Sequence, residues 1–155
     1  MEKKKPTIKT LLEFEEGRRR SAYKCTNGFW TIGVGHRLTD KELGMYEERI
    51  SNSEVDNLLE TDITEATEAA KKYPWFDKLN EARQAVVISM IFQLGKFGFD
   101  KFQNTIKLIA KGNYEGAAAQ MLRSLWEKQT PNRAKRHAEQ FKTGVWCEEY
   151  GHDRT

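Results

Sequence analysis

The sequence predicts an α+β protein, with a small sheet in the first half of the chain and helices elsewhere. Three observations predict it: strand signals in residues 19–38, a helical apolar period that starts at Ser51, and helical patterns through most of the second half. Strands that are grouped together, and do not alternate with helices, are typical of α+β folds. The 155 residues suffice for one domain, or for two small lobes that share a core.

A short helix and a hairpin are expected first. Residues 7–15 place apolar side chains at helical spacing, and Gly17 suits the position just past a helix end. Residues 19–38 are then β-prone, and Asn27-Gly28 favours a hairpin turn because both residues tolerate positive φ. The chain is therefore predicted to pass from helix to sheet beside Glu16.

A long helix is expected to follow the sheet. Ser51 and Glu54 form a capping-box pair at its start, and Tyr73-Pro74 ends it. At 1.5 Å per residue this helix would be roughly 30 Å long. Such a length can join two lobes.

The remaining helices are predicted from periodicity and caps. Residues 85–95 are apolar nearly all round, which predicts a buried central helix that ends at Gly95. Residues 102–111 predict another helix. Asn113 is expected to cap a single helix that carries apolar residues as far as Trp126. These apolar residues are Ala117, Met121, Leu122, Leu125 and Trp126.

The last predicted helix has clear signals at both ends. Thr130 is its expected N-cap, Pro131 stands at the first helical position, and Gly144 marks its end.

Composition excludes several classes of protein. Hydrophobic residues make up 38% and charged residues 32%, an ordinary globular mixture, and no apolar run approaches the length of a membrane span. The net charge of +3 is too weak to indicate nucleic-acid binding, even with RAKR at 133–136. The basic start, MEKKKPTIKT, lacks the apolar core of a signal peptide, so we expect synthesis and retention in the cytosol.

Residue chemistry gives only a weak indication of a site. An isolated Glu16 would usually be a surface charge, but at a helix–sheet junction its carboxylate can project into a notch between lobes. Cys25 lies just before a polar turn, a poor place for a core residue, whereas Thr31 is an ordinary strand residue. His36 is interpreted as a structural hydrogen-bonding residue. Three histidines without HExxH or paired cysteines predict no metal site.

Two blocks of sequence resemble the phage-type lysozymes, glycoside hydrolase family 24, and in particular its T-even phage members. In the first block, residues 16–36, Glu16, Cys25 and Thr31 follow the spacing of a family signature whose second position is Asp or Cys. The second block consists of SMIFQLG at 89–95, QTPNRAKR at 129–136 and TGVW at 143–146. The resemblance extends over about residues 8 to 150.

This resemblance implies a lysozyme-like fold, in which a small β-containing lobe and a larger helical lobe flank a cleft. The chain would form one domain, residues 1–155. The β-containing lobe would span about 14–60, the linking helix 52–72, and the helical lobe 1–13 plus 73–155. Between residues 39 and 51 the chain is shorter than the T-even members, so one small helix is expected to be trimmed.

The resemblance also implies roles for individual residues. Glu16 would be the general acid, Cys25 would replace the second carboxylate, and Thr31 would hold the attacking water or the sugar. Arg133 would pair with Glu16 as catalytic support, and a second supporting pair would be His36 with Asp62. The residues expected to line the substrate cleft are Arg37, Phe92, Gln93, Thr105 and Gln120. At the position of Arg37 the T-even phage enzyme has an apolar residue.

The implied activity is that of an endolysin, a muramidase that hydrolyses the β-1,4 bond between N-acetylmuramic acid and N-acetylglucosamine in peptidoglycan. We expect a monomer without metal or cofactor that neither binds nucleic acid nor inserts into a membrane. It would wait in the host cytoplasm and reach the periplasm and cell wall through a holin-type pore. Two alternatives are a lytic transglycosylase and a catalytically impaired cell-wall-binding module. Whether Cys25 acts as a base, acts as a nucleophile or takes no part in the reaction stays open.

Overall fold

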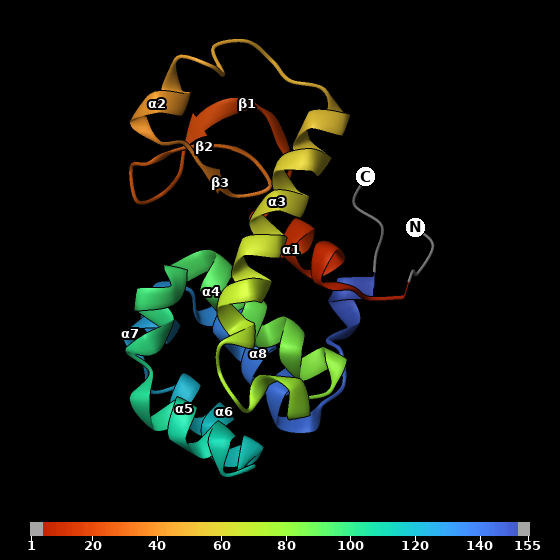
Figure 1. Cartoon of the computed structure of the whole chain (residues 1–155), viewed down its shortest axis with the longest axis vertical. Helices are drawn as coiled ribbons and strands as arrows, with labels where there is room; N and C mark the ends of the chain where they lie inside the picture. Colours follow the sequence, from red (N-terminus) through yellow and green to blue (C-terminus); the bar gives the residue numbers. More distant parts are fainter. Residues whose placement is uncertain (1–4, 152–155) are drawn as a thin grey trace.

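The computed structural model describes residues 5–151 and confirms the predicted α+β class. A small sheet lies at one end of the molecule, helices fill the other, and the long helix α3 runs between them (Figure 1). The outer ends of the predicted lobes, residues 1–4 and 152–155, lie outside the described residues.

The first elements form the helix-to-sheet junction. Thr7 caps α1 through a capping box with Thr10, and Gly17, at φ 75°, ends the helix by donating its N–H to the Glu13 carbonyl. The chain then turns into an antiparallel sheet of order β1-β2-β3. In the register of this sheet Thr31 lies opposite Tyr23 on one side and Arg37 on the other. The bounds are α1 Ile8–Glu16, β1 Arg19–Lys24, β2 Trp30–Gly33 and β3 His36–Arg37.

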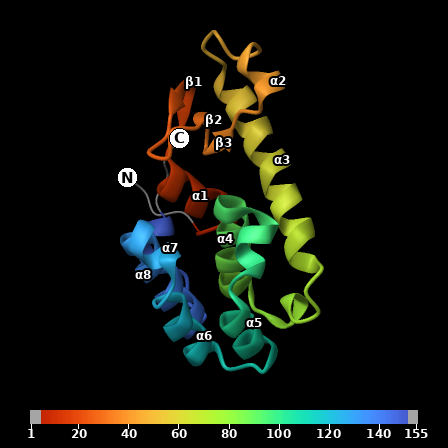
Figure 2. The ribbon, with the colours of Figure 1, turned by 90° about the vertical axis from the view of Figure 1, so that its left-hand side faces the viewer.

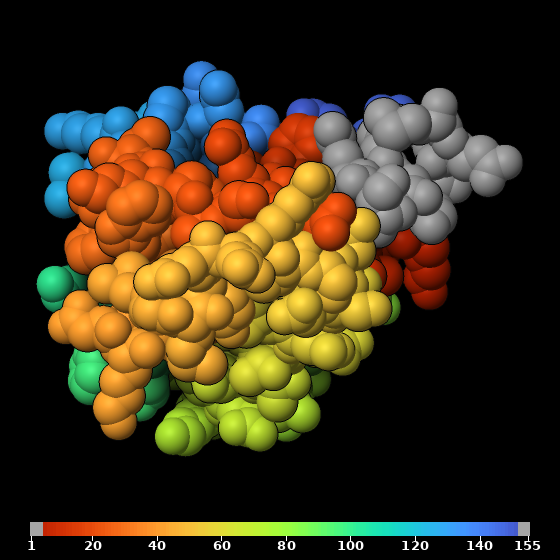
Figure 3. All heavy atoms as spheres, turned by 90° about the horizontal axis from the view of Figure 1, so that it is seen from above, coloured from red at the N-terminus to blue at the C-terminus, as the bar shows by residue number. Residues whose placement is uncertain are grey.

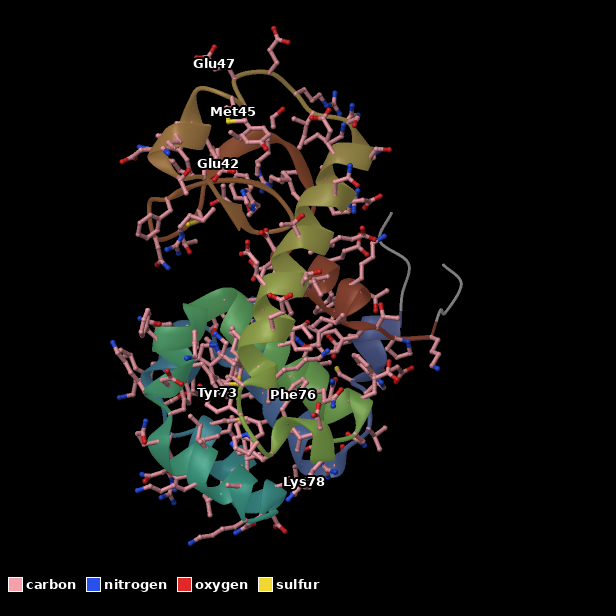
Figure 4. All side chains as sticks on the ribbon, in the orientation of Figure 1. Glu42, Met45, Glu47, Tyr73, Phe76 and Lys78 are labelled. Carbon is pink, nitrogen blue, oxygen red and sulfur yellow. The ribbon has the colours of Figure 1, made fainter. Side chains whose placement is uncertain are left out.

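The segment between the sheet and α3 holds one helical turn, α2 (Asp40–Leu43). Figure 3 looks down on this end of the molecule, where the sheet, α2 and the start of α3 form the outer face. In Figure 4, Met45 and Glu47 lie at the outermost edge, in the connection from α2 to α3.

The long helix α3 (Asn52–Lys71) is capped by Ser51, whose hydroxyl accepts from the Glu54 N–H while the Glu54 carboxylate accepts from the Ser51 N–H. This is the predicted capping box. Its buried face carries Val55 and Leu59 beside the sheet and Ala66 and Ala70 beside the helices. Because α3 contributes to both clusters, it connects the sheet to the helical part (Figure 2).

The helical part encloses the larger apolar core. Its central helix is α4, where Val86, Val87 and Met90 are fully buried. Tyr73 and Phe76 lie where α3 meets this part (Figure 4). No helix within residues 5–151 is both long and apolar enough to cross a membrane. The bounds are η1 Phe76–Lys78, α4 Glu81–Asp100, α5 Gln103–Ala110, α6 Tyr114–Met121, α7 Leu125–Gln129, α8 Pro131–Thr143 and η2 Glu148–Gly151.

A second apolar cluster joins α1 to the sheet. Leu11 and Leu12 of α1 are fully buried and belong to one cluster with Ile32 of β2, Val55 of α3 and Tyr150 of η2. Helix α1 also contacts α4, so it lies at the junction of the sheet and the helices. Its last residues are thereby placed between the two parts.

Two helix boundaries differ from the prediction. Gly95, at φ 75° and ψ 165°, does interrupt the helical geometry, but the chain resumes helix at once and continues to Asp100. The single helix predicted from Asn113 to Trp126 is wrong, because it is two helices: α6 ends at Met121, and Ser124 caps α7 by accepting from the Glu127 N–H.

Two details of the predicted helix ends also change. Leu122 and Leu125 lie at the break between α6 and α7 and are 42% and 68% exposed, so they do not extend the buried face. Thr130 precedes α8 but caps it without a side-chain hydrogen bond, because its hydroxyl donates to the Trp126 carbonyl of α7.

The cap of α3 gives a test of the fold. Ser51→Ala removes the acceptor for the Glu54 N–H, so the free energy of unfolding should fall by about 1 kcal/mol in urea titrations. Ser53→Ala is the matched control, since Ser53 is exposed in the first turn of the same helix. Equal stabilities of the two variants would contradict the capping role.

Candidate active site

A cleft of about 1200 Å³ lies where the sheet faces the helices. Glu16 from the end of α1 and Cys25 and Thr31 from the sheet line it, and α3, α4 and α8 supply the rest of its walls. The structure therefore brings the three predicted catalytic residues to one cavity. Along α4 the wall includes Gly95, where the helical geometry is interrupted.

Glu16 is placed by the end of α1 and by α8. It is the last residue of α1, and its side chain is 21% exposed. Arg133, in the first turn of α8, donates from Nη1 to Glu16 Oε2 at 2.6 Å, and its side chain is only 7% exposed. A partly buried carboxylate with one fixed partner holds one orientation toward the cleft.

Gly35 closes the other side of Glu16. At φ 65° it adopts a conformation that L side chains rarely take. A Cβ there would lie 2.8 Å from Glu16 Oε1 and 2.9 Å from its Cδ. Only glycine lets the turn between β2 and β3 approach the carboxylate this closely, which explains the glycine before His36 in TIGVGH.

Cys25 lies at the end of β1, where the hairpin turns. Its N–H donates to the Phe29 carbonyl at 2.9 Å, and its carbonyl accepts from the Gly28 N–H at 2.8 Å. Burial acts to raise the pKa of the thiol, but hydrogen bonds from the Phe29 and Asn27 backbone, the nearby Thr31 hydroxyl and the Arg37 charge together lower it below its ordinary value. Cys25 is therefore better suited to form a thiolate than a free cysteine is.

Thr31 is buried in the middle of β2, with 5% of its surface exposed, and it lines the cleft. Its hydroxyl donates to the Phe29 carbonyl at 3.0 Å. The oxygen keeps its lone pairs, so it can accept a hydrogen bond from a water or a sugar hydroxyl.

His36 lies between two carboxylates at the upper wall of the cleft. Its Nδ1 is 2.7 Å from Asp62 Oδ2 on α3, and its Nε2 is 2.9 Å from Glu42 Oε2 on α2. The hydrogen bond to Asp62 raises the pKa of His36 most; burial acts to lower it, and the bond to Glu42 raises it further, to about 9. His36 is thus an imidazolium at neutral pH that ties β3 to two helices.

The predicted cleft-lining residues divide into two groups. Arg37, Phe92 and Gln93 line the cleft; the Arg37 guanidinium lies 3.9 Å from the Phe29 ring centre, and Gln93 Oε1 accepts from the Trp126 indole. Thr105 and Gln120 do not line it. Thr105 is buried within α5 and Gln120 is half-buried on α6, so their roles as substrate contacts stay predictions.

Several residues of the site were not found by sequence reasoning. Glu42, six residues after His36, is the clearest of them. It forms a capping box with Thr39, and this threonine–glutamate spacing is a signal that can be seen in the sequence. Others are Glu15, which takes a bidentate ion pair from Arg136, and the buried His137. In the part of the chain that the structure describes, no group of three or more histidine, cysteine, aspartate and glutamate side chains is arranged so that it could hold a metal ion.

A two-part α+β molecule with a carboxylate held in the cleft between sheet and helices is the arrangement expected of a glycan-cleaving enzyme of the lysozyme type. Comparison with known proteins gives the family: residues 13–151 match the model of the phage lysozyme family. The chain therefore belongs to the phage lysozyme family and is a peptidoglycan-degrading lysozyme hydrolase.

Individual relatives come from different organisms. A probable T4-type lysozyme of Dictyostelium discoideum is 31% identical over 162 residues, which cover 90% of this chain and 95% of the relative. The pre-baseplate central spike protein Gp5 of Enterobacteria phage T4 is 29% identical over 91% of this chain and 28% of its own length. An endolysin of Salmonella phage P22 is 31% identical over 77% of this chain and 80% of its own.

The His36 clamp predicts a pH dependence of stability. The pKa of His36 is about 9 in the folded protein and 6.5 in the unfolded chain. The stabilisation that the charged His36 gives to the folded state is therefore complete below pH 6.5 and is lost as the pH rises through about 9. The loss should be at most about 3 kcal/mol. Melting temperatures across this range should fall more steeply for the native protein than for His36→Gln. If the melting temperatures of the two proteins change with pH in parallel, the charged hydrogen bonds of His36 to Asp62 and Glu42 do not stabilise the fold.

Proposed function

We propose that the chain is an endolysin-type muramidase that hydrolyses the β-1,4 bond between N-acetylmuramic acid and N-acetylglucosamine, with Glu16 as the proton donor. The observation that carries the proposal is the Glu16 carboxyl group, which is held in the cleft by Arg133 at 2.6 Å. Glycoside cleavage needs a proton on the leaving oxygen and a second group that assists on the opposite face of the sugar. Glu16 supplies the first.

Cys25 is the candidate for the second group. It lines the same cleft just after β1, and its lowered pKa makes the thiolate easier to form than in an ordinary cysteine. As a base toward water it gives inversion, and as a nucleophile on the anomeric carbon it gives retention. Thr31 accepts a hydrogen bond from the water or the sugar in either case.

The biological setting is proposed from the relatives. The endolysin of phage P22 supports a role in host lysis, whereas the T4 spike protein shows that related domains also occur in larger proteins. We infer a monomer that accumulates in the host cytoplasm and reaches the cell wall through a holin-type pore. Expression in bacteria with and without a pore-forming partner tests this route, because lysis without the partner would contradict it.

Product analysis separates hydrolysis from its alternatives. Purified peptidoglycan is digested, and the released fragments are examined by mass spectrometry. Reducing ends support the muramidase, anhydro ends would indicate a lytic transglycosylase, and no released fragments would indicate a binding module.

Glu16→Gln should reduce cleavage of peptidoglycan by about 10²–10⁴-fold, because the amide cannot donate the proton. Circular dichroism should show an unchanged fold. Glu60→Gln is the control, since Glu60 is exposed on α3 and does not line the cleft. Lysis by Glu16→Gln within a few-fold of the native protein would overturn the assignment.

Substitution of Cys25 tests the thiol. Cys25→Asp should keep activity and lower the pH optimum, because a carboxyl group ionises near pH 4 and a thiol near about 8.5. Cys25→Ser has similar size but little basicity, so it should lose up to about 10²–10⁴-fold. If serine matches cysteine across the pH range, thiolate chemistry is excluded, and Glu16 with the shaped cleft carries the reaction.

A further inference from the structure

A chain of buried polar groups runs behind the active-site ion pair and takes no part in the mechanism above. His137 on α8 is fully buried, Ser89 on α4 is fully buried, and Tyr150 on η2 is fully buried. Ser89 Oγ lies 2.7 Å from His137 Nε2, and His137 Nδ1 lies 3.0 Å from the Tyr150 hydroxyl oxygen. This series of hydrogen bonds ends at Arg133 on one side and at Glu15 on the other.

The direction of the hydrogen bonds is fixed first at Tyr150. Its hydroxyl donates to Glu15 Oε2, a carboxylate that also accepts two bonds of 2.8 Å from Arg136. A phenol has only one proton to donate. Toward His137 the Tyr150 oxygen must therefore accept, which places a proton on His137 Nδ1.

The other ring nitrogen then has no proton. Within residues 5–151, His137 forms no hydrogen bond with a carboxylate. Complete burial, with the nearby charges of Arg133 and Arg136, lowers the pKa of the imidazole well below its ordinary value. A neutral imidazole with Nδ1–H has a bare Nε2. That nitrogen accepts from the Ser89 hydroxyl.

Ser89 Oγ in turn accepts from Arg133. The Arg133 Nη2 donates to it at 2.9 Å, while Nη1 donates to Glu16. Within residues 5–151, Arg133 Nε is buried without a hydrogen-bond partner. The orientation of the guanidinium thus depends on two residues, Glu16 in front and Ser89 behind.

We propose that His137 is a positioning residue for Glu16. As the neutral Nδ1–H tautomer it orients the Ser89 hydroxyl, which holds Arg133 in register with Glu16. Each group in this series of hydrogen bonds then donates to the next one. The series runs from the cation Arg133 through Ser89, His137 and Tyr150 to the anion Glu15. The catalytic consequence rests on the proposed role of Glu16 as proton donor.

Protonation of His137 would disrupt this arrangement. A proton on Nε2 would face Ser89 Oγ, so the Ser89 hydroxyl would have to turn away. The groups that surround the ring are the cations Arg133 and Arg136 on its own helix, Tyr150 with Glu15 behind it, Ser89 on α4 and the Trp126 ring on α7. A third cation between two arginines is unfavourable, so the neutral ring is the functional form.

The tautomer can be observed directly in the native protein, independently of activity. Nitrogen chemical shifts of ¹⁵N-labelled histidine should show His137 with Nδ1 protonated and Nε2 bare, unchanged between about pH 5 and pH 8. His36 is the internal contrast, because it should be an imidazolium over the same range. An Nε2–H tautomer, or an ordinary titration of His137, would overturn the proposal.

Variants test the link to catalysis. His137→Leu and Ser89→Ala should each lower kcat by roughly tenfold or more with little change in KM, since small displacements of a catalytic group cost up to about 10²-fold. His137→Gln, whose amide oxygen can replace Nε2 as acceptor, should restore part of the loss. Gln140→Leu is the control: Gln140 is buried on the same helix but bonds to Ala82 and Cys147.

The expected control result is lower stability with unchanged kcat. If Ser89→Ala and folded His137→Leu keep the native kcat and lose only melting temperature, His137 is a merely structural core residue and the proposal fails. If His137→Leu does not fold, the kcat of Ser89→Ala alone decides whether the proposal stands. Failure of Glu16→Gln to reduce cleavage would instead overturn the proposed function and leave the tautomer result standing.

Discussion

The ion pair between Glu16 and Arg133 is the interaction on which the rest of the site depends. The two residues are 117 positions apart, so their 2.6 Å contact fixes the end of α1 against the start of α8. Gly17 ends α1 at this point, and Gly35 lets the sheet approach the carboxylate from the other side. Ser89 and His137 complete the support from behind. A buried arginine left without its carboxylate is costly, so the pair also stabilises the junction.

Similar carboxylate–arginine ion pairs occur along α1. Glu13, Glu15 and Glu16 are three nearby carboxylates, and each has an arginine partner: Arg18 for Glu13, Arg136 for Glu15 and Arg133 for Glu16. The two arginines of α8 stand three residues apart, so they share one face of the helix and meet two successive glutamates. The glutamates of EFEEGRRR therefore join α1 to α8 through Glu15 and Glu16, while Arg18 of the same run pairs with Glu13, so the run is not simply a solvated surface.

Local signals made much of the fold predictable. The capping box at Ser51 and Pro131 at the start of α8 act within a few residues, and the structure has the corresponding elements. The hairpin also forms, but its turn is closed by the Gly28 N–H donating to the Cys25 carbonyl, and only Gly28 of the predicted pair has a positive φ. The break between α6 and α7 was missed because the apolar residues continue through it, while Ser124 caps a new helix.

The site was less predictable because it depends on distant contacts. Family resemblance supplied Glu16 and Arg133. The helical spacing of Ala134 and Phe141 places His137 on the buried face of α8, but no local pattern joins it to Ser89 and Tyr150. Resemblance also transfers positions without geometry, which is why Thr105 was expected in the cleft although α5 buries it.

The most direct test of the central claim is the dependence of Glu16→Gln on the leaving group. The variant and the native protein are compared on a cell-wall glycan and on a matching glycoside whose leaving group departs without protonation. If Glu16 donates the proton, Glu16→Gln should lose about 10²–10⁴-fold on the glycan and far less on the activated glycoside. Equal losses on both substrates would show that Glu16 does not act as the acid.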